Sequence, residues 1–308
     1  MFRLAFGVTL SILFPSLCLM AQGVSVADSF TTDRALGLYQ YRVHMPLGQT
    51  FVNCTTVPKT STVRFHLPNK EAEPLLLRDT LPGRLRTTVS LASPNTSGYS
   101  RKTTATMRGA VVQYDASGSM TVDDDPARYL MELRPDTDIP LDLEMNLGYG
   151  SAWLDLTNLD LRTINISSGA ADVYISYKNV GKSPVREFII NGGMAKVVVR
   201  NLEMARAENV YIENGMGDTK LIVGDKVIQR TNMRVIVGTG TCTMLADQDV
   251  PIRLIMNSNV FSSVEIPADF VKTRDGTFVN LAFKKSPERA MTVTVDPGLG
   301  KFVLVSYE

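Results

Sequence analysis

A glycine-centred unit of two short strands repeats along the second half of the chain, and this repeat limits the fold more than any other feature. The copies, aligned on their corner, read MNLGYGSAWLDL (145–156), NISSGAADVYI (165–175), IINGGMAKVVV (189–199), YIENGMGDTKLIV (211–223), VIVGTGTCTML (235–245) and LIMNSNVFSSVEI (254–266). The corner residues are Gly150, Gly169, Gly193, Gly215, Gly240 and Asn259, with spacings of 19, 24, 22, 25 and 19. Such a period is typical of a stacked repeat protein.

A final copy, TVTVDPGLGKFVLV (292–305), places Gly298 at the same corner position. It follows Asn259 by 39 residues, so we expect a degenerate unit between the two.

Each unit alternates apolar and polar residues on both sides of its corner, which predicts strands. Phe188 and Ile190 precede one corner, and Val197 and Val199 follow it. Glycine or asparagine would supply the positive φ of a sharp turn. A unit this small cannot bury its own inward face, but stacked copies can. We therefore predict an all-β protein: a right-handed, parallel, β-solenoid-like stack of about seven rungs.

An antiparallel sandwich is the alternative, because glycine corners also join the strands of hairpins. The stack is favoured because the same positions stay apolar through several copies. Asp172 and Asp218 also occupy matching sites just after their corners.

The N-terminus predicts export. Residues 1–21 contain one positive charge, Arg3, then an apolar stretch and Ala21, which is the pattern of a secretory signal peptide cleaved after Ala21. Cleavage would lower the formal net charge from +1 to zero, which offers no electrostatic case for nucleic acid. Cys54 and Cys242 would remain, either as one disulfide or as two separate thiols.

Residues 22–124 predict a second, β-rich region. Strand-like runs at 50–57, 61–67, 86–92 and 109–116 are separated by stretches rich in Pro, Ser, Thr and Asn. Because the end of a stack exposes unpaired backbone, we expect this region to flank or cap the solenoid of residues 125–308.

Residues 139–175, 201–225 and 290–305 resemble the bacterial toast-rack family of exported or membrane-associated β-repeat proteins. The resemblance covers about residues 125–308. Related chains include adhesin-like domains and extracytoplasmic parts of envelope-stress regulators. The resemblance implies a fold and a compartment, but it carries no catalytic residues. Unlike the regulators, this chain shows no second hydrophobic segment, so we expect no membrane span in the mature protein.

No pattern predicts catalysis, a metal site or a cofactor. His44 and His66 are the only histidines, and no ligand cluster surrounds them. The run VDDDP (122–126) lacks the ligand spacing of a calcium loop, and GMGDTK (215–220) enters a strand where a phosphate loop would enter a helix. The carboxylates of Asp155, Asp172 and Asp218 do not align in one column.

The outward side chains predict an interaction face instead. Apolar residues recur where a solvated face would be polar. On the first strands we expect Ile189, Tyr211, Ile236 and Ile255 to stand one above another in a single outward column on four successive rungs, and the second strands add Tyr174, Val198 and Leu245. Either the N-terminal region or a partner would cover them. We expect an exported, non-catalytic protein, periplasmic, on the outer surface or extracellular, that binds a protein or glycan at the cell envelope or associates with itself. The alternatives are a carbohydrate-active β-helix enzyme and a regulator of an envelope-stress sensor.

Overall fold

The structure is a computed structural model. It describes residues 24–31, 37–54, 57, 59–67, 73–81, 84–92, 104–107, 110–114, 120–122, 129–225, 230–257, 262–274 and 276–308. The predicted signal peptide, the acidic residues of the VDDDP run and the predicted corner residue Asn259 lie outside these ranges.

Nearly all the secondary structure is β, as predicted. The strands before the repeat region are β1 (Val24–Thr31), β2 (Leu38–Val52), β3 (Thr60–Leu67), β4 (Glu73–Leu81), β5 (Arg84–Ala92), β6 (Thr104–Met107), β7 (Ala110–Tyr114), β8 (Met120–Val122) and β9 (Leu130–Arg134). Those of the repeat region are β10 (Pro140–Asp155), β11 (Asp160–Ser176), β12 (Glu187–Met194), β13 (Val197–Arg200), β14 (Asn209–Met216), β15 (Thr219–Val223), β16 (Thr231–Thr239), β17 (Thr241–Asp247), β18 (Ile252–Met256), β19 (Ser263–Glu265), β20 (Val271–Arg274), β21 (Thr277–Val279), β22 (Met291–Asp296) and β23 (Lys301–Tyr307). The helical pieces are η3 (Leu202–Ala205), α1 (Leu281–Lys285) and η4 (Pro287–Arg289).

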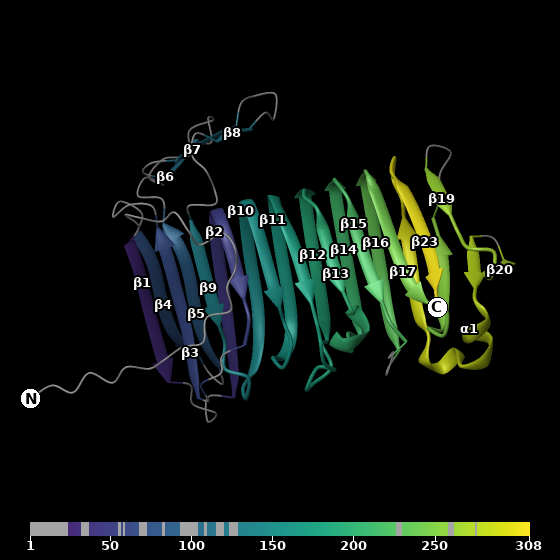
Figure 1. The fold of residues 1–308 in the computed structure, drawn as a ribbon, viewed down its shortest axis with the longest axis horizontal. Helices are drawn as coiled ribbons and strands as arrows, with labels where there is room; N and C mark the ends of the chain where they lie inside the picture. Colours follow the sequence, from purple (N-terminus) through teal and green to yellow (C-terminus); the bar gives the residue numbers. More distant parts are fainter. Residues whose placement is uncertain are drawn as a thin grey trace, which may run out of the picture.

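β6, β7 and β8 form a separate three-stranded antiparallel sheet, and the other strands form two faces that meet at the glycine corners. On the first face the pairing order is β4, β5, β2, β10, β11, β12, β14, β16, β22, β18, β21 and β20. On the second face it is β1, β3, β9, β2, β10, β11, β13, β15, β17, β23 and β19. The long strands β2, β10 and β11 run through the corner and belong to both faces. Figure 1 shows the resulting stack, running from the purple N-terminal strands to the yellow C-terminal ones. The parallel pairing confirms the solenoid-like stack over the sandwich, while its predicted handedness stays a prediction.

The core lies between the two faces and consists of aligned apolar columns. In one column every side chain is buried at 3% exposure or less, and each residue is paired with the next: Tyr41, Leu143, Ile164, Phe188, Val210, Met233, Val293 and Leu254. Stacking is what removes these side chains from water, because no unit has a second layer of its own. The inward positions predicted from the alternation are thus confirmed.

The corners use glycine in two columns, where the sequence predicted one. Gly150, Gly240 and Gly298 adopt positive φ as predicted, but Gly169, Gly193 and Gly215 do not; in the unit of Gly215 the positive φ belongs to Gly217. The other column consists of Gly169, Gly193, Gly215, Gly238 and Gly298, each of which lies against backbone oxygens of the neighbouring layer. A Cβ on Gly193 would lie 2.5 Å from the carbonyl oxygen of Gly169 in the layer beside it.

The C-terminal end departs from the predicted order. The last strands, β22 and β23, do not end the stack: β22 pairs with β16 on one side and β18 on the other, and β23 pairs with β17 and β19. The degenerate unit expected between Asn259 and Gly298 is also absent from the described residues. That segment forms β20, β21, α1 and η4, and β21 runs antiparallel to β18. Its strands close the end of the stack.

The N-terminal strands continue the stack beyond β10. β2 pairs in parallel with β10 along both faces and with β5 and β9 on its other side. The antiparallel strands β4, β3 and β1 complete this end, where Arg78 of β4 forms a 2.7 Å ion pair with Asp28 of β1. These strands flank the repeat region at this end.

Candidate binding face

The predicted outward residues lie on the expected faces, but they do not form the predicted single column. Ile189 is paired with Tyr211, whereas Tyr211 is paired with Arg234. Ile236 lies one outward row further along, opposite Glu213. Ile255 returns to the row of Tyr211, but Thr294 stands between it and Arg234.

The error has a physical cause in the two glycine columns. Gly240, which the sequence suggested as the partner of Gly215, belongs to the positive-φ column, and the glycine stacked on Gly215 is Gly238. Aligning the wrong glycine shifts the register by two residues. Because side chains alternate with a period of two, such a shift preserves the face and changes only the row.

On the second face, Tyr174 and Val198 continue a row of aromatic rings. Phe51 stacks on Trp153 with ring centroids 4.9 Å apart, and Trp153 stacks on Tyr174 at 5.8 Å. Val198 follows in the same row and is buried at 6% exposure, while Leu245 belongs to the next row. Since the rings cover one another's faces, this row stabilises the stack and presents ring edges to solvent. A hollow of about 350 Å³ lies beside it.

A larger groove, of about 680 Å³, crosses the first face over β12, β14, β16 and β22. We call it the polar groove; its lining residues are Glu187, Ile189, Asn209, Val210, Tyr211, Asn232, Met233, Arg234, Asn257, Thr292 and Thr294. Two outward rows supply most of them. Glu187, Asn209, Asn232 and Thr292 form one row, and Ile189, Tyr211, Arg234 and Thr294 form the other.

Several side chains in the polar groove are held by neighbours, among them Asn209, whose amide donates a 3.4 Å hydrogen bond to the backbone oxygen of Arg186. The hydroxyl of Tyr211 donates a 2.6 Å hydrogen bond to Glu213, and this bond, together with partial burial, raises the pKa of Tyr211. Arg234 forms a 2.9 Å ion pair with Asp296, which also accepts a hydrogen bond from Asn257. The tyrosine ring and the guanidinium are therefore fixed in place.

Other polar side chains in the groove have no hydrogen-bond partner among the described residues. Within the described part of the chain, the side chains of Glu187, Asn232, Thr292 and Thr294 make no hydrogen bond or ion pair. The same two rows look different on β2, β10 and β11. There Arg42 forms a 2.7 Å ion pair with Glu144, and Thr163 donates a hydrogen bond to Asp142. More of the polar side chains in these two rows are paired with one another on β2 and β10 than in the groove, although Asn165 of β11 also makes no side-chain hydrogen bond among the described residues.

Sequence reasoning found Ile189 and Tyr211 but missed the polar residues between and beside them. The sequence carries only a weak signal for them. Asn209, Asn232 and Thr292 each stand next to a buried residue of their strand, so the alternation predicts that their side chains point outward. Polar residues at outward positions are ordinary. Only the register shows that these three stand side by side.

The carboxylates considered for catalysis do not form a free pair. Asp172 is paired with Ser151, and Asp155 with Ser176, so the two occupy different rows, as predicted. On the first face Glu213 and Asp296 share a row with Ile236 between them, but each is engaged by its own partner and neither lines the polar groove.

Histidine and cysteine supply no site in the described structure. His44 is exposed, His66 is half-buried, and no group of three metal-ligating side chains occurs among the residues that the structure places. Cys54 and Cys242 are both free thiols. Burial raises the pKa of Cys242 to about 12, which makes that thiol inert at neutral pH.

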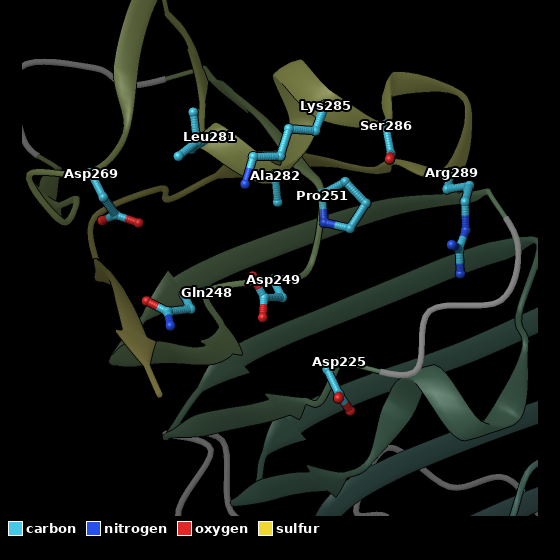
Figure 2. A pocket seen from close by; sticks show the side chains of 10 residues that line it. All are labelled: Asp225, Gln248, Asp249, Pro251, Asp269, Leu281, Ala282, Lys285, Ser286 and Arg289. Atoms are coloured by element: carbon cyan, nitrogen blue, oxygen red, sulfur yellow. The ribbon is translucent and has the colours of Figure 1, made fainter.

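A second hollow, of about 410 Å³, lies at the C-terminal end (Figure 2). Lys285 on α1 lies on one side of it, and Asp249 and Asp225 lie on the other. Its wall is a mixture of exposed carboxylates and cations. Asp269, at its rim, already accepts a 3.1 Å hydrogen bond from Ser306. Among the described helices, none has the length and hydropathy to cross a membrane.

These features define a class: a stacked β-repeat protein whose first face carries an open polar groove. Residues 83–200 match the family model described as the N-terminal domain of toast_rack, DUF2154. The resemblance to the toast-rack family inferred from the sequence is confirmed, although the match begins earlier than residue 125 and ends at residue 200.

Two solved structures are similar to the chain at low identity. One, from Clostridium sporogenes, is described as a "putative cell adhesion protein"; it has 11% identity and a TM-score of 0.44, with 92% of this chain and 100% of that chain covered. The other, a "putative adhesin" from Bacteroides fragilis, has 9% identity and a TM-score of 0.33, with 92% and 97% covered. Among curated proteins, no sequence matches this chain significantly.

Proposed function

We propose that this protein is an exported, non-catalytic β-stack that binds a partner at the cell envelope through the polar groove. The single observation that carries the proposal is the contrast along the first face. On β2 and β10 these groups are paired with one another, whereas Glu187, Asn232, Thr292 and Thr294 on β12, β16 and β22 have no side-chain partner among the described residues. A concave surface with fixed and unoccupied polar groups is the usual form of a binding site.

Further support comes from the sequence and from the arrangement of acidic groups. Residues 1–21 have the pattern of a signal peptide, which would deliver the chain to the envelope or beyond. Glu213 and Asp296, the carboxylates beside the groove, are held by Tyr211 and Arg234. A general acid or base needs a group free to exchange a proton with a substrate, so this arrangement favours binding over catalysis.

The test is capture of envelope fractions by the immobilised mature chain, residues 22–308. We expect the wild type to retain material from the envelope of its native cell, and the double variant Asn232→Ala/Thr294→Ala to retain several-fold less, because two hydrogen-bonding groups are lost. Mass spectrometry of the native protein should find its N-terminus at or near Gln22.

Asn146→Ala/Thr243→Ala is the matched control. Asn146 is an exposed asparagine on the first face outside the groove, and Thr243 is a half-buried outward threonine on the second face. Equal capture by the groove variant and this control would contradict the assignment of the groove. An intact Met1 in cytoplasmic protein would contradict export.

A further inference from the structure

We infer that the ligand of the polar groove is a linear, uncharged glycan that lies along the axis of the stack, across the strands. The inference rests on the proposed function, because it names the chemistry of the partner for the same groove.

The direction of the groove comes from its lining residues, which lie on consecutive parallel strands. Glu187 is on β12, Asn209 on β14, Asn232 on β16 and Thr292 on β22, while Asn257 directly follows β18. With a strand spacing of about 4.8 Å, five neighbouring strands extend over about 19 Å. A long, narrow ligand that crosses the strands fits this surface.

An extended peptide would not gain its usual backbone hydrogen bonds here. Peptides that bind to sheets add a strand to an unpaired edge. Each of β14, β16 and β22 is already paired on both sides. An apolar helix is disfavoured as well, because it would cover the amide of Asn232 and the hydroxyls of Thr292 and Thr294 without giving them partners.

The unoccupied groups of the groove suit sugar hydroxyls. The Asn232 amide both donates and accepts, and each threonine hydroxyl does the same. A sugar hydroxyl also does both, so it can satisfy any of these groups without strict orientation. The neighbouring row offers Ile189 and the ring of Tyr211, against which the C–H face of a sugar ring can pack. Because the Tyr211 hydroxyl is bound to Glu213, the side chain is ordered before the ligand arrives.

The charges of the groove disfavour an acidic polymer. Arg234 is its one basic lining residue, and this guanidinium is already paired with Asp296. Glu187 adds a carboxylate that has no ion-pair partner among the described residues. A polyanion would therefore meet an unpaired negative charge and no free positive one. The glycan is expected to be neutral.

The experiment is isothermal titration of the mature chain with three neutral linear hexasaccharides, cellohexaose, chitohexaose and maltohexaose, and with hexagalacturonic acid as the anionic probe. We expect at least one neutral probe to bind and the anionic probe to bind more weakly or not at all. Asn232→Ala should weaken binding of that probe about threefold to tenfold. Tyr211→Ala should weaken it at least as much. Tyr211→Phe should weaken it less than Tyr211→Ala, because it keeps the ring and loses only the hydrogen bond that orders it.

Asn146→Ala, outside the groove, should leave binding unchanged and serves as the matched control. Failure of every neutral probe to bind, or preference for the anionic one, would overturn the glycan. The envelope capture separates the two proposals. If groove variants lose capture, and protease treatment of the envelope fraction abolishes it, the proposed function stands and the partner is a protein. If groove variants change neither capture nor titration, both proposals are wrong.

Discussion

Gly193 illustrates how closely the corners of adjacent layers approach. A Cβ at this position would lie 2.5 Å from the carbonyl oxygen of Gly169, whereas a Cβ on Gly169 would lie 3.1 Å from that of Gly148. We therefore expect Gly193→Ala to lower the free energy of unfolding by about 1–3 kcal/mol, since a backbone oxygen must move to accept the methyl group. Gly169→Ala should lower the free energy of unfolding by a smaller amount. Urea denaturation of the mature chain measures both.

Gly181 provides the control for this comparison. It lies in the connection between two layers, where a Cβ would be 3.3 Å from the nearest atom, the carbonyl oxygen of Met204. Gly181→Ala should lower the free energy of unfolding by no more than Gly169→Ala does. If all three variants lost the same stability, the loss would reflect a general effect of alanine, and close approach at the corner would not explain Gly193.

The ends of β10 and β11 are joined by a hydrogen-bonded cluster around Asp155. Its carboxylate accepts a 2.7 Å bond from Lys178 and a bond from the hydroxyl of Thr157, which in turn accepts the backbone N–H of Lys178. Burial alone would raise the pKa of Asp155, but the bonds from Lys178 and Thr157 outweigh it and hold the pKa below its ordinary 3.8. The cluster ties one layer to the next.

Asp155→Asn should therefore lower stability at pH 7 by about 0.5–1 kcal/mol, a modest value because the side chain of Lys178 is 73% exposed. A carboxyl whose pKa is lower in the folded state stabilises above its unfolded pKa and loses that contribution as the pH falls through the folded pKa. The difference in the free energy of unfolding between wild type and Asp155→Asn should thus be constant near neutral pH and shrink below pH 3.8. Urea denaturation across this range measures it.

Lys301, which forms an ion pair with Glu265 near the C-terminal end, offers a control for a general loss of charge. Lys301→Met should leave the acid-dependent difference at Asp155 unchanged. A stability difference between wild type and Asp155→Asn that persisted undiminished in acid would contradict the ion-pair origin of the effect.

The last two strands, β22 and β23, connect the C-terminal end of the stack to the rest of the molecule. β22 and β23 contribute the buried side chains Met291, Val293, Val295, Phe302 and Leu304 and separate β16 and β17 from β18 and β19. Burial of each such side chain stabilises the folded state by about 1.5–3 kcal/mol. The five together contribute about as much as the total stability of an ordinary domain. A chain that ends at residue 290 should lose its folded C-terminal end, and limited proteolysis should cleave it between residues 248 and 290.

Removal of residues 22–31 is the comparison, because among the described strands β1 pairs with β3 alone, at the edge of the stack. That deletion should leave the proteolysis of residues 248–290 unchanged and lower the melting temperature only modestly. If the chain ending at residue 290 resisted protease as well as the full chain, β22 and β23 would not be holding β18 in place.

The sequence by itself determined the fold class, the strands and the inward faces. Alternation at positions such as Phe188 and Ile190 has a local cause, because successive side chains of a strand point to opposite sides. The glycine corners were also visible, since few residues other than glycine tolerate such turns and contacts. These properties depend on neighbours in the chain, so a single sequence reveals them.

Only the tertiary structure decided which residues stand beside one another. Two glycine columns two residues apart make two registers equally plausible from the sequence, and the wrong one placed Ile236 beside Tyr211 where Arg234 belongs. The insertion of β22 between β16 and β18, and with it the polar groove around Asn232 and Thr294, likewise depends on packing between distant segments. Parallel pairing is set by how well buried surfaces fit across layers, and that fit is a property of the assembled stack.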